Sequence, residues 1–197
     1  SVKEATGRDL KITGPVSLDI FPSIGVKAEQ VSLSNASWAS DAQMIFLKQI
    51  ELEVKLFPLI SGNVEISSIN LVGLEAHLQT NKAGQSNWDL TSPASAAKSN
   101  ATSSSSQATS DSSSFIAIET VRISDAHVTY QDGSGSTKVI EVPKLSLTGG
   151  GGKTVVLLDL QYGNYKVGLK GKTGSLRQAI IDWDQSPMKM NVDLTLT

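Results

Sequence analysis

The chain has 197 residues, of which 39% are hydrophobic and 5% aromatic, and it contains no cysteine. Its 17 basic and 19 acidic residues give a formal net charge of −2, with both signs mixed along the sequence. This balance argues against a nucleic-acid binder, which needs a concentrated basic face, and it offers no polybasic patch for anionic lipid. The lack of cysteine excludes disulfides, thiolate catalysis and cysteine metal sites.

No run of about eighteen apolar residues occurs, so the sequence predicts no transmembrane helix. Its first residues also lack the basic-then-apolar order of a signal peptide. Because the chain begins Ser1-Val2-Lys3-Glu4, without Met, we expect it to continue a longer protein.

Alternation of apolar and polar residues is the dominant pattern and predicts strands. It covers residues 12–20, 50–56, 74–78 and 188–196, and turn residues such as Ser61-Gly62-Asn63 and Gly163-Asn164 separate such runs. Side chains two apart share a face, so each strand has one apolar and one polar face, which is typical of antiparallel sheets. The prediction is an all-β fold: one or more antiparallel, strongly curved sheets of about ten to twelve strands, trough-like or sandwich-like, with little helix.

Two short helical turns and one tight hairpin are also expected. The first six residues can end a helix that stops at Gly7, and residues 175–181 can form another turn. Tyr162-Gly163-Asn164-Tyr165 is typical of a hairpin.

The composition changes abruptly at residues 91–114, which are rich in Ser, Thr and Ala. This stretch has almost nothing apolar to bury, so we expect a linker or a loose loop there. It divides the chain into a first β segment, residues 1–90, and a second, residues 115–197. We expect the second segment to continue the same sheet, with two separate lobes as the alternative.

One spacing of apolar residues, three, two and three, occurs in three places. The copies are Ala28, Val31, Leu33 and Ala36; Ile66, Ile69, Leu71 and Leu74; and Ile118, Val121, Ile123 and Ala126. A three-residue step would turn the apolar face toward water unless a bulge restores it, and a bulge bends the strand. The repeat therefore predicts a curved sheet with the copies in equivalent places.

No enzyme is indicated by the motifs. Gly152-Lys153-Thr154 lacks the first glycine of a phosphate-binding loop, and His77 and His127 fall on polar-face positions without a partner cluster. Asp182 and Asp184 are better suited to a turn than to acid–base chemistry. We therefore expect no catalytic residue, no metal and no cofactor.

A set of local features occurs in a particular order along most of residues 1–180. The features are Thr6-Gly7-Arg8, Ile20-Phe21-Pro22, Val31-Ser32-Leu33-Ser34-Asn35-Ala36, Leu56-Phe57-Pro58-Leu59-Ile60-Ser61-Gly62, Gly84, Asn87-Trp88, Ile123-Ser124-Asp125-Ala126-His127-Val128-Thr129-Tyr130 and Gly174-Ser175-Leu176. In this order and spacing the chain resembles the amino-terminal region of the AsmA family.

The resemblance implies a module of the envelope of Gram-negative bacteria. AsmA-like proteins are similar to bridge-like lipid-transfer proteins: a curled β-sheet with an apolar interior, held in the periplasm by an amino-terminal helix in the inner membrane. They are associated with outer-membrane integrity and with phospholipid movement between the two membranes. For this chain the resemblance implies an inner-membrane helix upstream of Ser1.

An apolar trough that binds phospholipid acyl chains is the functional hypothesis that joins the pattern to the resemblance. Its expected lining is Val16, Leu18, Ile20, Leu52, Val54, Leu56, Ile69, Leu71, Val121, Ile123 and Val128. The same residues would equally form the closed core of a sandwich. Two other functions are a scaffold for outer-membrane protein assembly, which would pair client strands or other envelope proteins at its edges, and a carbohydrate-binding sandwich, which the low aromatic content disfavours.

Overall fold

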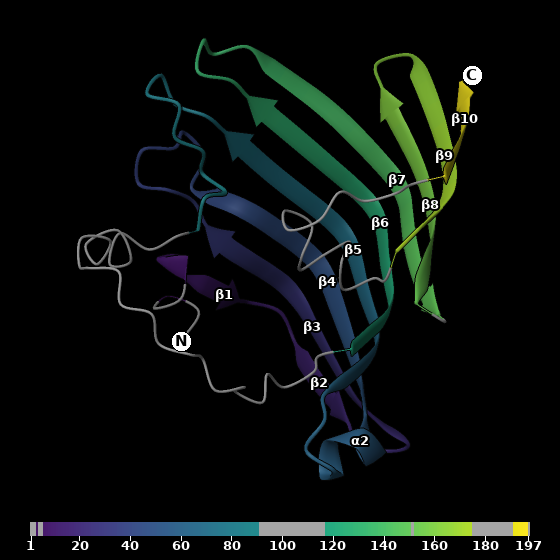
Figure 1. Ribbon diagram of the computed structural model, residues 1–197. Helices are drawn as coiled ribbons and strands as arrows, with labels where there is room; N and C mark the ends of the chain where they lie inside the picture. Colours follow the sequence, from purple (N-terminus) through teal and green to yellow (C-terminus); the bar gives the residue numbers. More distant parts are fainter. Residues whose placement is uncertain (1–2, 4–5, 91–116, 151, 175–190, 197) are drawn as a thin grey trace, which may run out of the picture.

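The chain forms one curved sheet, shown in Figure 1 as a computed structural model that describes residues 3, 6–90, 117–150, 152–174 and 191–196. Its elements are β1 (Leu10–Ile12), β2 (Val16–Asp19), β3 (Ser23–Ser34), β4 (Gln43–Lys55), α2 (Leu56–Ile60), β5 (Glu65–Gln79), β6 (Ala117–Gln131), β7 (Thr137–Gly150), β8 (Lys153–Tyr162), β9 (Tyr165–Thr173) and β10 (Asn191–Leu196). The predictions of a β fold with little helix and of strong curvature are therefore confirmed.

The sheet is nine strands wide, in the order β1-β3-β4-β5-β6-β7-β8-β9-β10, because β2 also pairs with β3 and lies in line with β1. The expected width of ten to twelve strands was wrong. The alternating run at residues 12–20 belongs to two short strands, β1 and β2, which together occupy one position at the edge of the sheet. Gly14 and Pro15 separate them, and proline cannot donate a backbone hydrogen bond to a neighbouring strand.

The pairing of β5 with β6 is parallel, so the expectation of a wholly antiparallel sheet was also wrong. A hairpin can join only antiparallel strands, whereas a parallel pair needs a long connection. Residues 80–116 supply that length between the two strands. Apolar and polar residues still alternate in both strands, because the outer face of this parallel pair carries polar residues such as Asn70 and Arg122.

The expected hairpin at residues 162–165 is confirmed. Tyr162 of β8 pairs with Tyr165 of β9, and Gly163 has a φ of +58°. The helical turn that ends at Gly7 is also present, since the Gly7 N–H donates to the Lys3 carbonyl and Gly7 has a φ of +67°.

A bend crosses the sheet at one level of five consecutive strands, β3 to β7. Each antiparallel pair skips one residue of each strand at this level, and the skipped residues are Gln30, Lys48, Gly73, Asp125 and Pro143. The parallel β5–β6 pair skips Gly73 and Asp125 together with the residues that follow them. Three of them have positive φ angles: Gln30 at +52°, Gly73 at +63° and Asp125 at +54°. Because every strand takes a three-residue step here, the sheet bends without losing its pairing, as Figure 1 shows.

The three-fold repeat is placed only in part as predicted. Its second and third copies pair directly, with Ile66 opposite Ile118 and Leu71 opposite Ile123. The first copy is displaced, because Ala28 is opposite Ile50, which in turn is opposite Leu71. The residues that do align across the sheet are those of the bend. Strands β4 and β7 make the same three-residue step there, although neither contains a copy of the apolar repeat.

All ten strands belong to a single open sheet, and within the described part of the chain no second sheet packs on it. The described strands therefore form one sheet and not the two packed sheets of a sandwich. The strands on both sides of residues 91–114 join through the β5–β6 pair. Residues 91–114, the expected turn at residues 175–181, and the pair Asp182 and Asp184 lie outside the described residues.

The most buried apolar cluster lies at the bend. Ala28, Val31 and Leu47 are 5%, 7% and 9% exposed, and Ile50, Leu71 and Leu74 pack against them. Ala28 and Val31 lie on either side of Gln30. The bend therefore brings the apolar side chains before it close to those after it. The curvature thus gives this single-layer sheet its small core.

Candidate functional site

The inner face of the curved sheet carries apolar residues at the same level of successive strands. One such row crosses seven strands. Its members, paired in turn from β3 to β9, are Val26, Leu52, Ile69, Val121, Leu147, Val156 and Gly171. Directly opposite residues of neighbouring strands share a face, so this row is a continuous band across the sheet.

A second row lies two residues along each strand, on the same face. It consists of Ala28, Ile50, Leu71, Ile123, Leu145, Leu158 and Leu169. Beyond the bend, a further row consists of Leu33, Ile45, Ala76, Val128 and Ile140. None of these three rows contains a charged residue. We call the surface that they form the inner face.

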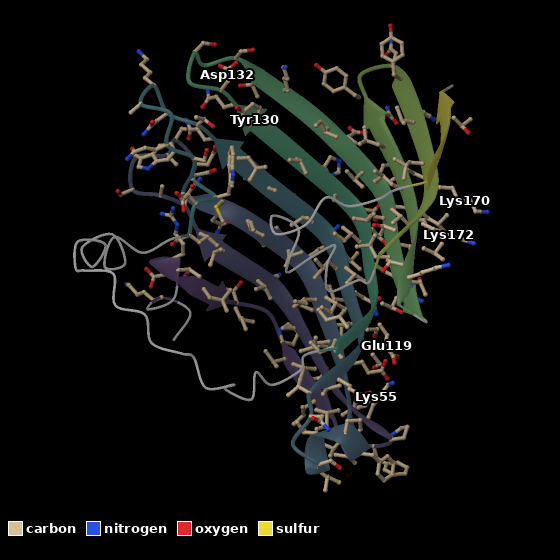
Figure 2. All side chains as sticks on the ribbon, viewed as in Figure 1. Lys55, Glu119, Tyr130, Asp132, Lys170 and Lys172 are labelled. Atoms are coloured by element: carbon tan, nitrogen blue, oxygen red, sulfur yellow. The ribbon has the colours of Figure 1, made fainter. Side chains whose placement is uncertain are left out.

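The opposite surface is polar. The level between the first two rows carries Lys27, Glu51, Asn70, Arg122 and Ser146 on β3 to β7. Lys170 and Lys172 of β9 belong to this outer surface and point away from the concave side of the sheet in Figure 2. The curl therefore places the apolar side inward and the charged side outward.

Most side chains of the inner face are half-buried rather than buried. Val121 and Val156 are each 8% exposed, but Leu52, Ile69 and Leu71 retain intermediate exposure. Contacts between elements are mainly those of neighbouring strands, and in the described part of the chain no helix lies over this face. A second layer would bury such side chains, so this face has the exposure of a surface.

The inner face contains most of the residues predicted to bind acyl chains. Leu52, Ile69 and Val121 lie in the first row, Leu71 and Ile123 in the second, and Val128 beyond the bend. Val54 is on the same face, opposite Ile24 and Ile66. The arrangement brings these residues together, and their contact with lipid stays a prediction.

Four predicted residues lie at the margins. Val16 and Leu18 of β2 continue the second and first rows, opposite Ala28 and Val26, and are 59% and 58% exposed. Ile20 follows β2 and is 60% exposed. Leu56 is the first residue of α2, at the end of β4.

The sequence reasoning missed the share of the inner face that β7, β8 and β9 contribute. Leu145 and Leu147 alternate with polar residues, so periodicity could have identified them. On β8 the signal is blurred, because Val155 and Leu157 are apolar on the outer surface. They lie opposite Lys172 and Lys170, whose aliphatic stems suit such neighbours.

At the end of the inner face that is farther from α2, a group of polar side chains surrounds Asn87. Asn87 is fully buried at 0% exposure. Its Nδ2 donates to Asn35 Oδ1 at 2.9 Å and to the His77 carbonyl at 2.7 Å, and its Oδ1 accepts from the Gln79 N–H at 2.8 Å. Arg8 Nη2 donates to the Asn87 carbonyl at 3.0 Å. The residues join the start of the chain to the ends of β3 and β5, and neither periodicity nor spacing indicated this network.

A hollow of about 840 Å³ adjoins this network. It is lined by Thr6, Gly7, Arg8, Ala36, Ser37, Trp38, Gly84, Gln85, Ser86, Trp88 and Asp89. Trp38 and Trp88 are 37% and 43% exposed, so both indoles present surface to solvent. The Trp88 ring also contacts Tyr130 of β6, with ring centroids 6.0 Å apart.

The groups with shifted pKa values lie away from the inner face. Hydrogen bonds from the Ser23 and Ser68 hydroxyls lower the pKa of Glu53 on the outer surface. An ion pair with Glu119 raises the pKa of Lys55, and both residues are labelled in Figure 2. Among the described residues, no group of three acidic or histidine side chains could hold a metal ion.

No described helix is both long enough and apolar enough to cross a bilayer. Neither the curated proteins nor the solved structures contain a significant match to the chain. The family model of the AsmA family matches residues 1–150. Since this match covers most of the sequence, including the strands β1 to β7 that carry the bend, the chain belongs to the AsmA family.

Proposed function

We propose that the inner face binds the acyl chains of phospholipids, and that the chain is a periplasmic module of an envelope protein that handles phospholipid between the inner and outer membranes. AsmA-family proteins are envelope proteins with a role in lipid handling or protein assembly. The observation that favours lipid is the inner face itself. It is an uncharged band across seven strands with the exposure of a surface.

The energetics suit acyl chains. Removing a lipid from a bilayer exposes methylenes at about 0.8 kcal/mol each, so a chain of ordinary length costs on the order of 10 kcal/mol. An apolar surface offsets this cost without a specific polar contact. Exposed apolar surfaces of this extent in folded proteins usually have a partner.

The dimensions also agree. Neighbouring strands are about 4.8 Å apart, so a row over seven strands extends roughly 29 Å across the sheet. The acyl layer of one leaflet is about half of a 30 Å bilayer core. An acyl chain that lies across the strands therefore stays on apolar surface along its whole length.

A matched pair of substitutions tests the proposal. Val128 of β6 lies on the inner face opposite Ile140 of β7. Val139, the residue before Ile140, lies on the outer surface and is 49% exposed. Val128→Asp places a charge among acyl chains, whereas Val139→Asp places the same charge in water. Native mass spectrometry of each gently purified protein, with circular dichroism as the check of folding, measures the bound lipid.

We expect phospholipid on the parent protein and on Val139→Asp, and a loss of at least tenfold on folded Val128→Asp. Three results contradict the proposal: a parent protein without lipid, equal lipid on both variants, or an unfolded Val128→Asp beside a folded Val139→Asp. The last result would identify the inner face as a packed core.

The scaffold alternative has weaker support. An exposed strand edge can pair with a client strand, but the β1 and β2 edge is short, three and four residues, and Pro15 interrupts it. Crosslinking of a client strand to this edge would favour the scaffold.

A further inference from the structure

We propose that the hollow beside Asn87 binds a phosphate group through Arg8, and that it recognises the phosphodiester of a lipid whose acyl chains lie on the inner face. The inference rests on the proposed function and adds a headgroup site to it. The hollow of about 840 Å³ is large enough for a headgroup, and its described lining includes one arginine and two tryptophans.

Arg8 is held in place with donors to spare. Its Nη2 donates to the carbonyl of the fully buried Asn87, which is itself fixed by Asn35, His77 and Gln79. Its Nε is buried with no hydrogen-bond partner, and so is Asn35 Nδ2 in the same network. Both atoms are shielded from the hollow, so a ligand there would meet the terminal amino groups of the guanidinium, whose planar donors are suited to an anionic oxygen pair.

An aromatic contact joins one wall of the hollow to a residue of β6. Trp88 lines the hollow and touches Tyr130, with centroids 6.0 Å apart. Tyr130 lies two residues beyond Val128 on β6, on the same face. A ligand that fills both regions would place its apolar chains on the rows and its phosphate at Arg8.

Charge selects the kind of phosphate. Among the described lining residues, Arg8 carries the single positive charge, which the two negative charges of a phosphomonoester would exceed. A phosphodiester carries a single negative charge and balances it. Indole faces favour a neighbouring ammonium group, which suits an ethanolamine headgroup.

Three soluble probes separate headgroup from chain recognition. They are dihexanoyl phosphatidylethanolamine, dihexanoylglycerol with the same chains and no phosphate, and glycerophosphoethanolamine with no chains. Titration calorimetry gives the affinities, and tryptophan emission reports on the hollow, because Trp38 and Trp88 are two of the chain's three tryptophans.

Arg8→Gln removes the guanidinium, and we expect it to weaken binding of the phospholipid about tenfold while leaving that of dihexanoylglycerol unchanged. Arg8→Lys keeps the charge without the planar donors and should lie between Arg8→Gln and the parent. Lys82→Gln is the matched control, since Lys82 is exposed on the loop after β5 that supplies part of the lining but does not itself line the hollow.

A second variant leaves the Asn87 network intact. Ser37→Glu places a negative charge in the hollow from an exposed position, and we expect it to weaken phospholipid binding about tenfold without affecting dihexanoylglycerol. Ser61→Glu, beside α2 at the other end of the strands, is its control.

The outcomes separate this site from the proposed function. Equal binding of both dihexanoyl lipids by the parent, or equal losses for both in Arg8→Gln and Ser37→Glu, overturns the headgroup site and leaves the inner face as a lipid surface. Arg8-dependent binding of glycerophosphoethanolamine alone, with neither lipid bound, supports the phosphate site, assigns it to a soluble phosphodiester and contradicts the proposed function. No response of tryptophan emission to any probe overturns the site.

Discussion

Single residues determine where this sheet bends, and Gly73 is the most constrained of them. It has a φ of +63°, and a Cβ there would lie 2.8 Å from the Cβ of Lys48 on the neighbouring strand. Gln30 and Asp125 have similar φ angles at the same level of β3 and β6 but retain side chains. Only Gly73 therefore combines a backbone that favours glycine with a close neighbour.

Gly73→Ala is expected to lower the free energy of unfolding by about 2–4 kcal/mol, from about 1–2 kcal/mol of left-handed strain and a similar cost for the contact with Lys48. Gly163→Ala is the control, because Gly163 has a φ of +58° and nothing within 4 Å of an added Cβ. Urea denaturation of both variants measures the difference. An equal decrease in the free energy of unfolding for both variants would mean that Lys48 moves away from the added methyl group at little cost.

Among the elements, the β6–β7 hairpin is closed by a charged side chain. Asp132 Oδ1 accepts hydrogen bonds from the Ser134 hydroxyl at 2.6 Å and from the N–H groups of Ser134 and Ser136 at 2.9 and 3.0 Å. These bonds, with that of the Ser134 hydroxyl the largest cause, lower the pKa of Asp132. The carboxylate therefore favours the folded hairpin only while it is ionised.

The pH dependence follows from that lowered pKa. A carboxyl group whose pKa is lower in the folded than in the unfolded state contributes stability above its unfolded pKa, about 3.9, and loses it as the pH falls through the folded pKa. Asp132→Asn keeps an acceptor oxygen and removes the titration. We expect its Tm to fall less than that of the parent between about pH 5 and pH 2, and an equal fall would exclude Asp132 as a contributor.

For the whole molecule, one parallel strand pair decides the connectivity. β5 and β6 lie side by side in the same direction, so residues 80–116 must return the chain along the length of a strand. Fifteen residues of β5 cover roughly 50 Å. The parallel pair requires a connection long enough to span β5, whatever the sequence of that connection.

Deleting residues 91–114 should therefore prevent the β5–β6 pairing, because residues 80–89 are already engaged at the end of β5 and too few would remain. Replacing the same stretch with Gly and Ser at equal length should leave the stability nearly unchanged. Hydrogen exchange of the β6 amides distinguishes the two variants. Full protection of β6 in the deletion variant would contradict this connectivity.

By itself, the sequence determined the strands and their two faces, because a period of two places alternate side chains on opposite surfaces whatever the pairing. Leu52, Ile69, Val121 and their neighbours could thus be assigned to one apolar face, and the tight hairpin and the curvature could be predicted from local turn and bulge signals.

Only the tertiary structure decided the pairing partners, because they depend on residues far apart in sequence. Alternation is the same in parallel and antiparallel strands when one face is wet, so the direction of β6 relative to β5 was not encoded locally. The level of the bend and the meeting of Arg8, Asn35 and Asn87 are likewise decided by register, which joins segments up to 79 residues apart. The exposure of the described apolar side chains was decided in the same way, since it depends on what the rest of the chain places over a strand.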